Sequence, residues 1–169
     1  MRCDPVMMAE LGGPLPRDGI AAKVARDVAE AAADREWIMM ILPDPADDDV
    51  VAGSVVLWSH ADPDLAAPGD AAPEPLSEIG WMVLPEFQGQ GLGREATRLL
   101  LNRAAADGRW GAAVHAFPGV SNTASNGICR SLGFALVGQE VVTFNGRRLP
   151  TNHWVIDPAA TGRAANATT

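Results

Sequence analysis

The stretch "EFQGQGLGRE", residues 86–95, places Gly89, Gly91 and Gly93 directly before an arginine and an apolar helical pattern. Glycine costs backbone entropy on folding, so three of them at the start of a helix indicate that something must approach bare backbone. Unpaired N–H groups and the positive end of a helix dipole meet at such a point, and both favour a phosphate. The stretch therefore predicts a phosphate-binding loop between a strand and a helix.

Two familiar phosphate loops fit this stretch poorly. A P-loop requires the pattern GxxxxGK[ST], and the stretch contains no lysine, which excludes that class. A dinucleotide-binding loop requires GxGxxG/A, which Gly91, Gly93 and Ala96 satisfy. That motif normally opens a domain, and an acidic residue on the next strand holds a ribose hydroxyl. Here the motif lies at mid-chain and the next strand, "AAVHAF", carries no acid, so one part of the dinucleotide pattern is absent.

A third interpretation rests on two blocks that resemble one family. Residues 88–93, "QGQGLG", fit Q/R-x-x-G-x-G/A, which resembles the coenzyme A pyrophosphate loop of the GNAT N-acetyltransferase superfamily. The later block "NTASNGICRSLGF", residues 122–134, is similar to that family's Asn at a strand end, short helix and Gly-Phe. The flanking stretches 4–28 and 146–156 resemble the RimJ/RimL-like branch, which acetylates protein N-termini or small amines. The resemblance covers roughly residues 4–157.

Hydrophobic periodicity and glycine or proline breaks predict the order of elements, beginning with a short helix within residues 4–13. Asp18 is expected to be the N-cap of the next helix. The further elements are a helix at 19–33, strands at 37–42, 50–58 and 78–84, a helix from 92 to about 108, a strand at 111–117, a helix at 123–132, and a closing antiparallel pair around "NGRR". The resemblance implies the GNAT fold, an α/β fold whose mixed, mostly antiparallel sheet has a splayed central pair of strands and flanking helices.

Relatives in the family begin with a strand before the segment that resembles "DPVMM", and only "MRC" precedes it here. We therefore expect that first strand to be missing and the strand at 37–42 to form an edge of the sheet. Exposed edges pair with other chains unless they are protected. This predicts a homodimer, or a cover over that edge from elsewhere in the chain.

Size, charge and composition indicate how many domains, which partners and which location to expect. The size predicts a single domain at residues 1–157, a long loop at 59–77 and a disordered tail at 158–169. Net charge is −8 and Lys23 is the only lysine, so we expect no nucleic-acid partner and an amine-bearing small molecule or peptide instead. No apolar run approaches the roughly 20 residues of a membrane helix, so we expect no membrane partner. Two cysteines predict a cytoplasmic protein without a disulfide framework, and no ligands cluster at metal spacing.

The resemblance also implies how acetyl-CoA, as cosubstrate, would bind. Backbone groups of Met82, Val83 and Leu84 would pair with the pantetheine arm between splayed strands, and Asn122 would bond the arm from the far side. The same implication assigns the remaining cofactor contacts to Gln88, Gly89, Gln90, Gly91, Leu92, Gly93, Arg94 and Ser125.

The acceptor amine must lose a proton, and Glu78 lies where many RimJ/RimL-like enzymes carry a base that acts through water. The alternative for Glu78 is an ordinary carboxylate at a strand edge. His115 is a second candidate, since histidine titrates near neutral pH, although a histidine in a strand is often only packed there. Glu86 is expected to be solvated because it would repel a pyrophosphate. His60 and His153 have no evident partner in the sequence.

In this family the leaving thiolate is normally protonated by a tyrosine in the helix that here follows Asn122. This chain contains no tyrosine. Seven residues after Asn122 stands Cys129. Either its thiol supplies that proton, or water does and Cys129 is a small buried thiol. The predicted function is transfer of an acetyl group from acetyl-CoA to a primary amine. The alternative is a non-catalytic acyl-CoA-binding protein of the same fold, and a dinucleotide-dependent enzyme comes third.

Overall fold

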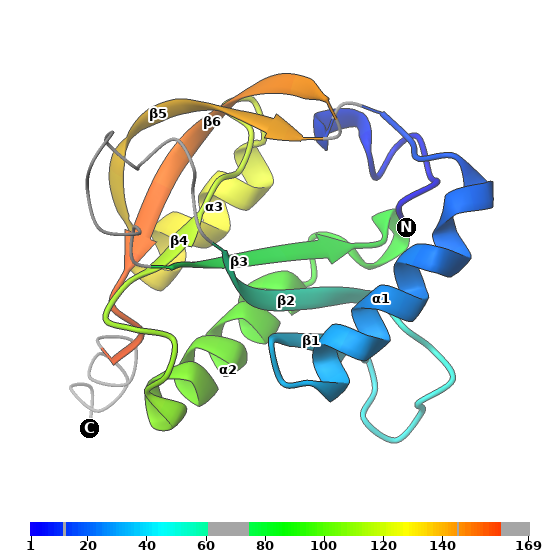
Figure 1. Cartoon of the computed structure of the whole chain (residues 1–169), viewed down its shortest axis with the longest axis horizontal. Coiled ribbons are helices and arrows are strands. Elements are labelled where there is room, and N and C mark those ends of the chain that lie inside the picture. The colour runs from blue at the N-terminus through cyan, green and yellow to red at the C-terminus, as the bar shows by residue number, and fades with distance from the viewer. Residues whose placement is uncertain (12, 61–74, 145, 160–169) are drawn as a thin grey trace.

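The computed structural model describes residues 1–11, 13–60, 75–144 and 146–159 of the chain. Within that part, six strands form one sheet in the order β1-β2-β3-β4-β6-β5 (Figure 1). Neighbouring strands are antiparallel except β3 and β4, which run parallel. The strands are β1 (Glu36–Ile41), β2 (Gly53–His60), β3 (Leu76–Val83), β4 (Val114–Ala116), β5 (Ala135–Phe144) and β6 (Arg147–Ile156).

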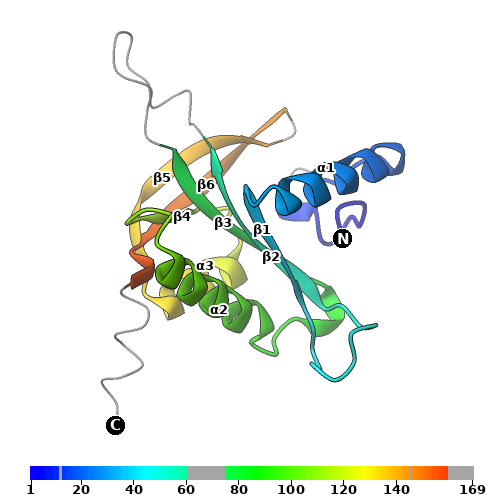
Figure 2. The ribbon, with the colours of Figure 1, turned by 60° about the horizontal axis from the view of Figure 1, so that its bottom comes forward.

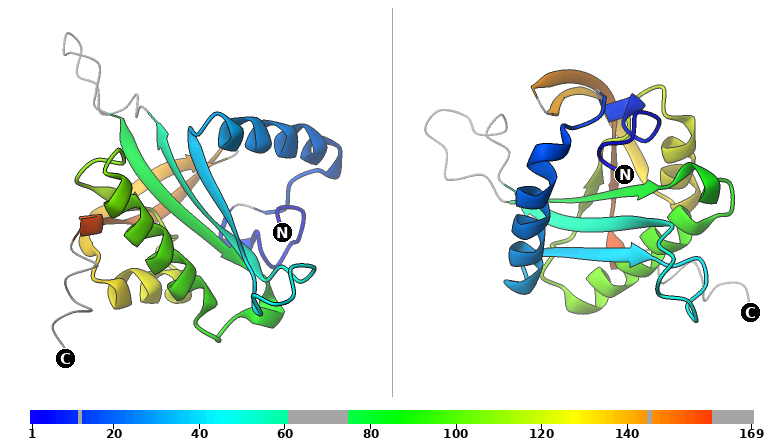
Figure 3. Two further views of the ribbon diagram at one scale, coloured as in Figure 1. Left: turned by 90° about the horizontal axis from the view of Figure 1, so that it is seen from below. Right: turned by 90° about the vertical axis from the view of Figure 1, so that its right-hand side faces the viewer.

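Helices lie on both faces of the sheet. The helices α2 (Leu92–Asp107) and α3 (Thr123–Leu132) cover one face, and α1 (Ile20–Ala32) lies against β1 on the other (Figure 2, Figure 3). The N-terminal segment reaches the tip of the β5–β6 pair, where Arg2 lies over the ring of Phe144 at 5.8 Å. The architecture confirms the predicted α/β fold with a mixed, mostly antiparallel sheet and flanking helices.

The core lies between the sheet and the α2–α3 layer. Leu57 of β2 and Ile79 of β3, 0% and 2% exposed, belong to one buried cluster with Leu100 and Leu101 of α2. Successive side chains of a strand point to opposite faces of the sheet. Glu78, next to Ile79, therefore points to the face on which α1 lies.

The strands β3 and β4 part after a short stretch of pairing. Ser77 pairs with Val114 and Glu78 pairs with His115, and the pairing ends there although β3 continues to Val83. Within the described part of the chain, the rest of this edge of β3 has no strand partner. The predicted splayed central pair is therefore present, and it leaves backbone groups available to an extended ligand.

The prediction of a short helix within residues 4–13 is wrong. This segment forms turns and a 3₁₀ helix, Ala9–Leu11. The carboxylate of Asp4 accepts hydrogen bonds from the backbone N–H groups two and three residues on, both at 2.9 Å. Aspartate favours a turn in this way, and here the turn prevails over the apolar pattern that follows.

The predicted cap of the second helix is also wrong, by one residue. Gly19 takes the N-cap position of α1 without a side-chain bond, and Asp18 lies in a preceding 3₁₀ turn, Arg17–Gly19. The strand predicted at 111–117 is limited to the three residues of β4, because Gly111 has φ +74° and belongs to the turn before it. The helix predicted at 123–132 is confirmed at both ends.

Some predictions fall on parts of the chain that the structure does not describe. The loop predicted at 59–77 lies outside the described residues from 61 to 74, and so does the predicted tail from 160 onward. At both ends the prediction of a loop is wrong, because residues 59–60 belong to β2 and residues 76–77 to β3. The side chain of His60 is likewise outside the description. Among the helices that are described, none is long and apolar enough to cross a membrane.

Candidate active site

A glycine loop joins β3 to α2. After β3 the chain makes a 3₁₀ turn, Pro85–Phe87, and α2 then begins with Gly91 as its N-cap. Gly89 and Gly91 have φ angles of +76° and +81°, which side-chain-bearing L residues rarely adopt. These two glycines are therefore required by the backbone path of the loop, and their predicted contact with a phosphate stays a prediction.

The start of α2 presents backbone donors that the helix itself does not use. The first helical bond runs from the N–H of Glu95 to the carbonyl of Gly91, at 3.0 Å. The N–H groups of Leu92, Gly93 and Arg94 precede it and have no intrahelical acceptor. Together with the helix dipole, these groups form a site that favours an anion at the mouth of the loop.

Gly93 has a different role from the other two glycines. It is buried, and a Cβ atom there would lie 3.1 Å from Cγ2 of Val83 and 3.3 Å from Cδ1 of Ile128. These distances are tighter than ordinary van der Waals contact, so a larger residue would push α2 away from β3 and α3. Close helix packing, the alternative to ligand binding, accounts for this glycine.

The C-terminal end of β3 is held on one edge and open on the other. Met82 pairs with Ser54 of β2, and the N–H of Leu84 donates to the carbonyl of Ala52 at 2.8 Å. The Gln88 side chain of the glycine loop donates to the carbonyl of Val83, at 2.9 Å. The loop is thereby tied to the strand that would receive the pantetheine arm, and the carbonyl of Val83 already has a hydrogen-bond partner.

The second predicted block forms the start of α3. The Asn122 side chain caps this helix, since its Oδ1 accepts the N–H of Ser125 at 2.9 Å. The hydroxyl of Ser125 accepts from Nε1 of Trp81 at 3.2 Å, which links α3 to β3. The structure thus brings Ser125 against Trp81 of β3 and uses Oδ1 of Asn122 as a helix cap, and the predicted contacts of both residues with a cofactor stay predictions.

The sequence analysis missed Asn126. This residue is 3% exposed, and its amide donates to the carbonyls of Gly119 and Asn122 at 2.9 and 2.7 Å. Its Oδ1 accepts from Asn152 and from Nε1 of Trp154, at 2.8 and 2.9 Å. Asn126 therefore holds the turn after β4 against β6. An asparagine one helical turn after Asn122 was the available signal.

Cys129 lies in the core. It is 0% exposed and belongs to the same buried cluster as Leu101 and Val114. Burial raises the pKa of its thiol to about 12. Its acidity is thus far below that of an ordinary thiol, and its chemical role stays a prediction.

Two histidines and a glutamate form a hydrogen-bonded chain beside Glu78. Nδ1 of His115 lies 2.7 Å from Nε2 of His153, and Nδ1 of His153 lies 2.6 Å from Oε1 of Glu140. The ring of His153 stacks on Phe117, with ring centroids 4.6 Å apart. The sequence analysis found no partner for His153, and the structure gives it two. Glu140 had no signal in the sequence, because its partner is far along the chain.

The hydrogen-bonded group of His115, His153 and Glu140 lies on the face of the sheet opposite α2 and α3. Val114 and Ala116, the neighbours of His115, are buried in the cluster that faces α2, so His115 points the other way. His115 is in register with Glu78 across the parallel β3–β4 pair. The two predicted base candidates are therefore neighbours, at the point where β3 and β4 part.

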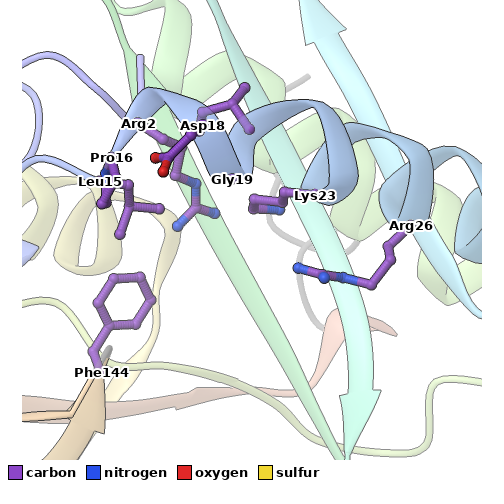
Figure 4. Close-up of a pocket in the computed structure, with 9 residues that line it drawn as sticks. Arg2, Leu15, Pro16, Asp18, Gly19, Lys23, Arg26 and Phe144 are labelled. Atoms are coloured by element: carbon purple, nitrogen blue, oxygen red, sulfur yellow. The ribbon is translucent and has the colours of Figure 1, made fainter.

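A cavity of about 620 Å³ lies on the same side of the sheet, between the N-terminal segment, α1 and the end of β5 (Figure 4). Arg2, Lys23 and Arg26 project into it, with Phe144 on the facing wall. Burial lowers the pKa of Arg2, although the charge of Asp27 acts in the opposite sense. No residue of the glycine loop lines this cavity, so it is separate from the anion site at the start of α2.

A glycine loop at a helix N-terminus, beside a sheet that parts at its centre, is typical of acetyltransferases that use coenzyme A. The chain belongs to the acetyltransferase (GNAT) domain family, whose model matches residues 1–135. No curated protein sequence is similar enough to the chain to match it.

Solved structures of acetyltransferases share the fold. RimL, a ribosomal alpha-N-protein acetyltransferase in complex with coenzyme A, is 20% identical with a TM-score of 0.64, over 86% of this chain and 75% of that one. A ribosomal-protein-alanine N-acetyltransferase from Brucella melitensis is 20% identical with a TM-score of 0.59, over 79% and 76%. The yncA protein of Salmonella typhimurium, with its cofactor acetyl-CoA, is 21% identical with a TM-score of 0.59, over 82% and 73%.

These comparisons confirm the predicted GNAT superfamily and, at the level of the fold, the predicted likeness to RimL-type enzymes. The roles assigned to individual site residues stay predictions. In the described part of the chain, no three His, Cys, Asp or Glu side chains converge as metal ligands would. The expected absence of a metal is a prediction that this observation leaves open to test.

Proposed function

We propose that this protein transfers the acetyl group of acetyl-CoA to a primary amine, on a small molecule or at a peptide N-terminus. The observation that carries the proposal is the row of N–H groups at the start of α2, without intrahelical acceptors and held by left-handed glycines beside the open edge of β3. Structures with the same fold are known with coenzyme A and with acetyl-CoA. A cytoplasmic location is part of the proposal.

The cofactor would lie across the parting of the sheet. Its pyrophosphate would accept from the N–H groups of residues 89–94, and the pantetheine arm would extend the open edge of β3 along Met82, Val83 and Leu84. Asn122 and Ser125 approach the same gap from the start of α3. This arrangement would bring the thioester close to Glu78 and His115, where β3 and β4 part.

The chemistry is direct attack of the amine on the thioester carbonyl. The ammonium form of the acceptor first loses a proton, and Glu78 is the proposed base, acting through water. The C–N bond then forms, and a backbone N–H of β3 stabilises the oxyanion. On collapse the C–S bond breaks and the second proton of the amine is lost. The thiolate takes up one proton, from water or from Cys129, so that the net products are the acetamide, coenzyme A and one proton.

The cavity is lined by the cations Arg2, Lys23 and Arg26 and by one anion, Asp18, and the excess of positive charge favours an acceptor that also carries an anionic group. Lys23 is paired with Asp27 at 2.8 Å, whereas Arg2 and Arg26 have no salt bridge among the described residues. Phe144 at the cavity is four residues from Glu140 on the same face of β5, a span of roughly 13 Å at 3.3 Å per residue. An extended peptide with its amine at the Glu78–His115 pair and an acidic side chain among its next residues would bring that side chain toward the cavity.

The test combines binding with turnover. Isothermal titration with acetyl-CoA and with NAD separates coenzyme A binding from dinucleotide binding. Release of free thiol from acetyl-CoA, measured with a panel of amines and peptides, then separates an enzyme from the alternative, an acyl-CoA-binding protein. Binding of acetyl-CoA without thiol release for any acceptor would favour that alternative.

A pair of peptides of equal length, one with acidic and one with basic residues at positions three to five, tests the acceptor preference. We expect the acidic peptide to have at least a tenfold higher kcat/KM, and Arg26→Gln to reduce that ratio. Equal kcat/KM values for the two peptides would contradict the preference and leave the acetyltransferase proposal intact.

A further inference from the structure

The chain of His115, His153 and Glu140 fixes which nitrogen of His115 is basic. The Glu140 carboxylate can only accept, so Nδ1 of His153 carries the proton of their 2.6 Å contact. In the neutral ring, Nε2 of His153 is then an acceptor, and the 2.7 Å contact requires a proton on Nδ1 of His115. Neutral His115 is therefore protonated at Nδ1 and has its lone pair at Nε2.

The surroundings of the chain supply negative charge to a protonated histidine pair. Glu78 of β3 is in register with His115, His153 of β6 contacts His115, and Glu140 of β5 contacts His153. All the charged groups in this set are acids, so a proton gained by the pair is stabilised from both ends.

We infer that His115, supported by His153 and Glu140, takes up the proton that the acceptor amine loses before it attacks the thioester. The inference rests on the proposed acetyltransferase function and adds the residues that make its base effective. The proton that Glu78 collects through water passes to Nε2 of His115. His153 and Glu140 act through His115, and they are positioning residues.

Each proton is accounted for in this step. An N–H bond of the ammonium breaks, and an N–H bond forms at Nε2 of His115. The proton at Nδ1 of His115 can then shift to Nε2 of His153, which places the positive charge beside the Glu140 carboxylate. When the product has left, the reverse shift returns the charge to His115, and the proton leaves from Nε2 to water.

Exposure of His153 and Glu140 is consistent with a proton store near solvent. The His153 side chain is 13% exposed and that of Glu140 is 48% exposed. The stacking of Phe117 on His153 keeps the imidazole plane in place while its charge changes. A histidine that only fills space in a strand would need neither a second ring nor a carboxylate in line.

The experiment compares wild type with Glu140→Gln, which keeps the length of the side chain and removes its charge. Loss of the carboxylate disfavours the imidazolium, so we expect the imidazole NMR signal of His115 to titrate at a pH lower by about 1 unit. The acidic limb of the kcat/KM profile should move by the same amount and in the same direction. Glu30→Gln is the matched control, because Glu30 is a carboxylate of α1 that pairs with Arg35 and does not belong to the His115–His153–Glu140 group.

His153→Phe retains a ring against Phe117 and cannot carry a proton. We expect it to lower kcat at neutral pH at least tenfold with an unchanged KM for acetyl-CoA. An acidic limb that stays in place in Glu140→Gln, whether or not the NMR titration moves, would overturn the inference, and so would full kcat in folded His153→Phe. Absence of thiol release from the wild type with every acceptor would instead overturn the proposed function itself.

Discussion

Among single residues, Cys129 is the one whose surroundings bear most directly on the leaving group. Its thiol has a pKa raised to about 12, whereas an ordinary thiol such as that of coenzyme A titrates near 8.5. Passing a proton from Cys129 to the departing thiolate is then uphill by on the order of 5 kcal/mol. This cost argues against Cys129 as the donor and for a packing role, and the thiolate is then protonated in exchange with bulk solvent, where a thiol of ordinary pKa is the favoured form at neutral pH.

We expect Cys129→Ala to keep kcat within about threefold of wild type, because the thiol is a poor acid. The small cavity left in the core should cost about 1 kcal/mol and lower Tm by about 3 °C. Stopped-flow thiol release and a thermal melt measure the two effects. A tenfold or larger fall in kcat, in a folded variant whose chemical step limits turnover, would assign the proton to Cys129.

Glu78→Gln addresses the proposed base. We expect kcat at neutral pH to fall by about 100-fold with a saturating amine, because amide nitrogen and oxygen cannot take up the proton. The KM for acetyl-CoA should remain within about twofold, since the cofactor does not need the carboxylate. Full kcat across neutral pH would show that Glu78 is an ordinary strand carboxylate.

At this scale the sequence predicted residues whose function depends on local backbone. Gly89 and Gly91 were predicted as part of a phosphate loop, and the structure shows that each adopts a left-handed φ angle, for which glycine is strongly preferred. The contact of His153 with Glu140 was not, since the two residues meet only when β5 and β6 pair. Asn126 was missed for the same reason, because its partners Asn152 and Trp154 lie on β6.

At the scale of elements, the proposed role of the loop before α2 can be tested by ligand binding. Gly91→Val adds a branched side chain at φ +81°, at the point where the pyrophosphate is proposed to lie. We expect at least a tenfold loss of acetyl-CoA affinity in isothermal titration. Gly111→Val is the matched control: its φ is +74°, and it lies beyond the other end of α2, roughly 24 Å away at 1.5 Å per residue. Equal losses of acetyl-CoA affinity in both variants would show that backbone strain alone, and not a clash with the pyrophosphate, causes the loss.

The turn after α1 is fastened to the turn after α2 by Asp34. Its carboxylate accepts from Nε1 of Trp37 at 3.0 Å and from both terminal nitrogens of Arg109, at 2.5 and 2.8 Å. These donors lower the pKa of Asp34 from 3.8 to about 2. A carboxylate with a lowered pKa contributes stability above its unfolded value, and the contribution is lost as pH falls through the folded value.

We therefore expect wild-type stability to decrease between about pH 4 and pH 2 in part through Asp34. Asp34→Asn should lower Tm at pH 7 and flatten the dependence of Tm on pH over that window. Thermal melts at several pH values measure both effects. Asp107→Asn is a suitable control, since its carboxylate also contacts Arg109, at 3.0 Å, and Trp37 is not among its bonded partners. Parallel Tm profiles for wild type and Asp34→Asn would contradict the assignment.

Element types followed from the sequence more reliably than element ends. Apolar runs and helical spacing identified the described strands and the three α-helices, because burial on one face or two faces imposes those periods. The error at residues 4–13 came from a local carboxylate bond that periodicity does not register. The parting of β3 from β4 came from the family resemblance, since it depends on pairings between strands far apart in the chain.

At the scale of the whole molecule, the sheet ends in β1 on one side and in β5 on the other. A groove of about 360 Å³ runs beside β1, between that strand and α2. Met40 and Leu99 line it, and they are 55% and 56% exposed. An edge strand with apolar side chains next to it favours pairing with another chain.

We predict that the protein is a homodimer in which two copies join along β1 and this groove. Light scattering should give twice the mass of one chain, and Met40→Lys should give a monomer, because a lysine at the edge opposes strand pairing and exposes charge to the groove. Val141→Lys is the matched control on the other edge, since Val141 of β5 is 52% exposed. If Val141→Lys dissociates the dimer and Met40→Lys does not, the interface lies on β5. A strict monomer at all concentrations would contradict pairing at either edge, and acetyl transfer would then have to be complete within one chain.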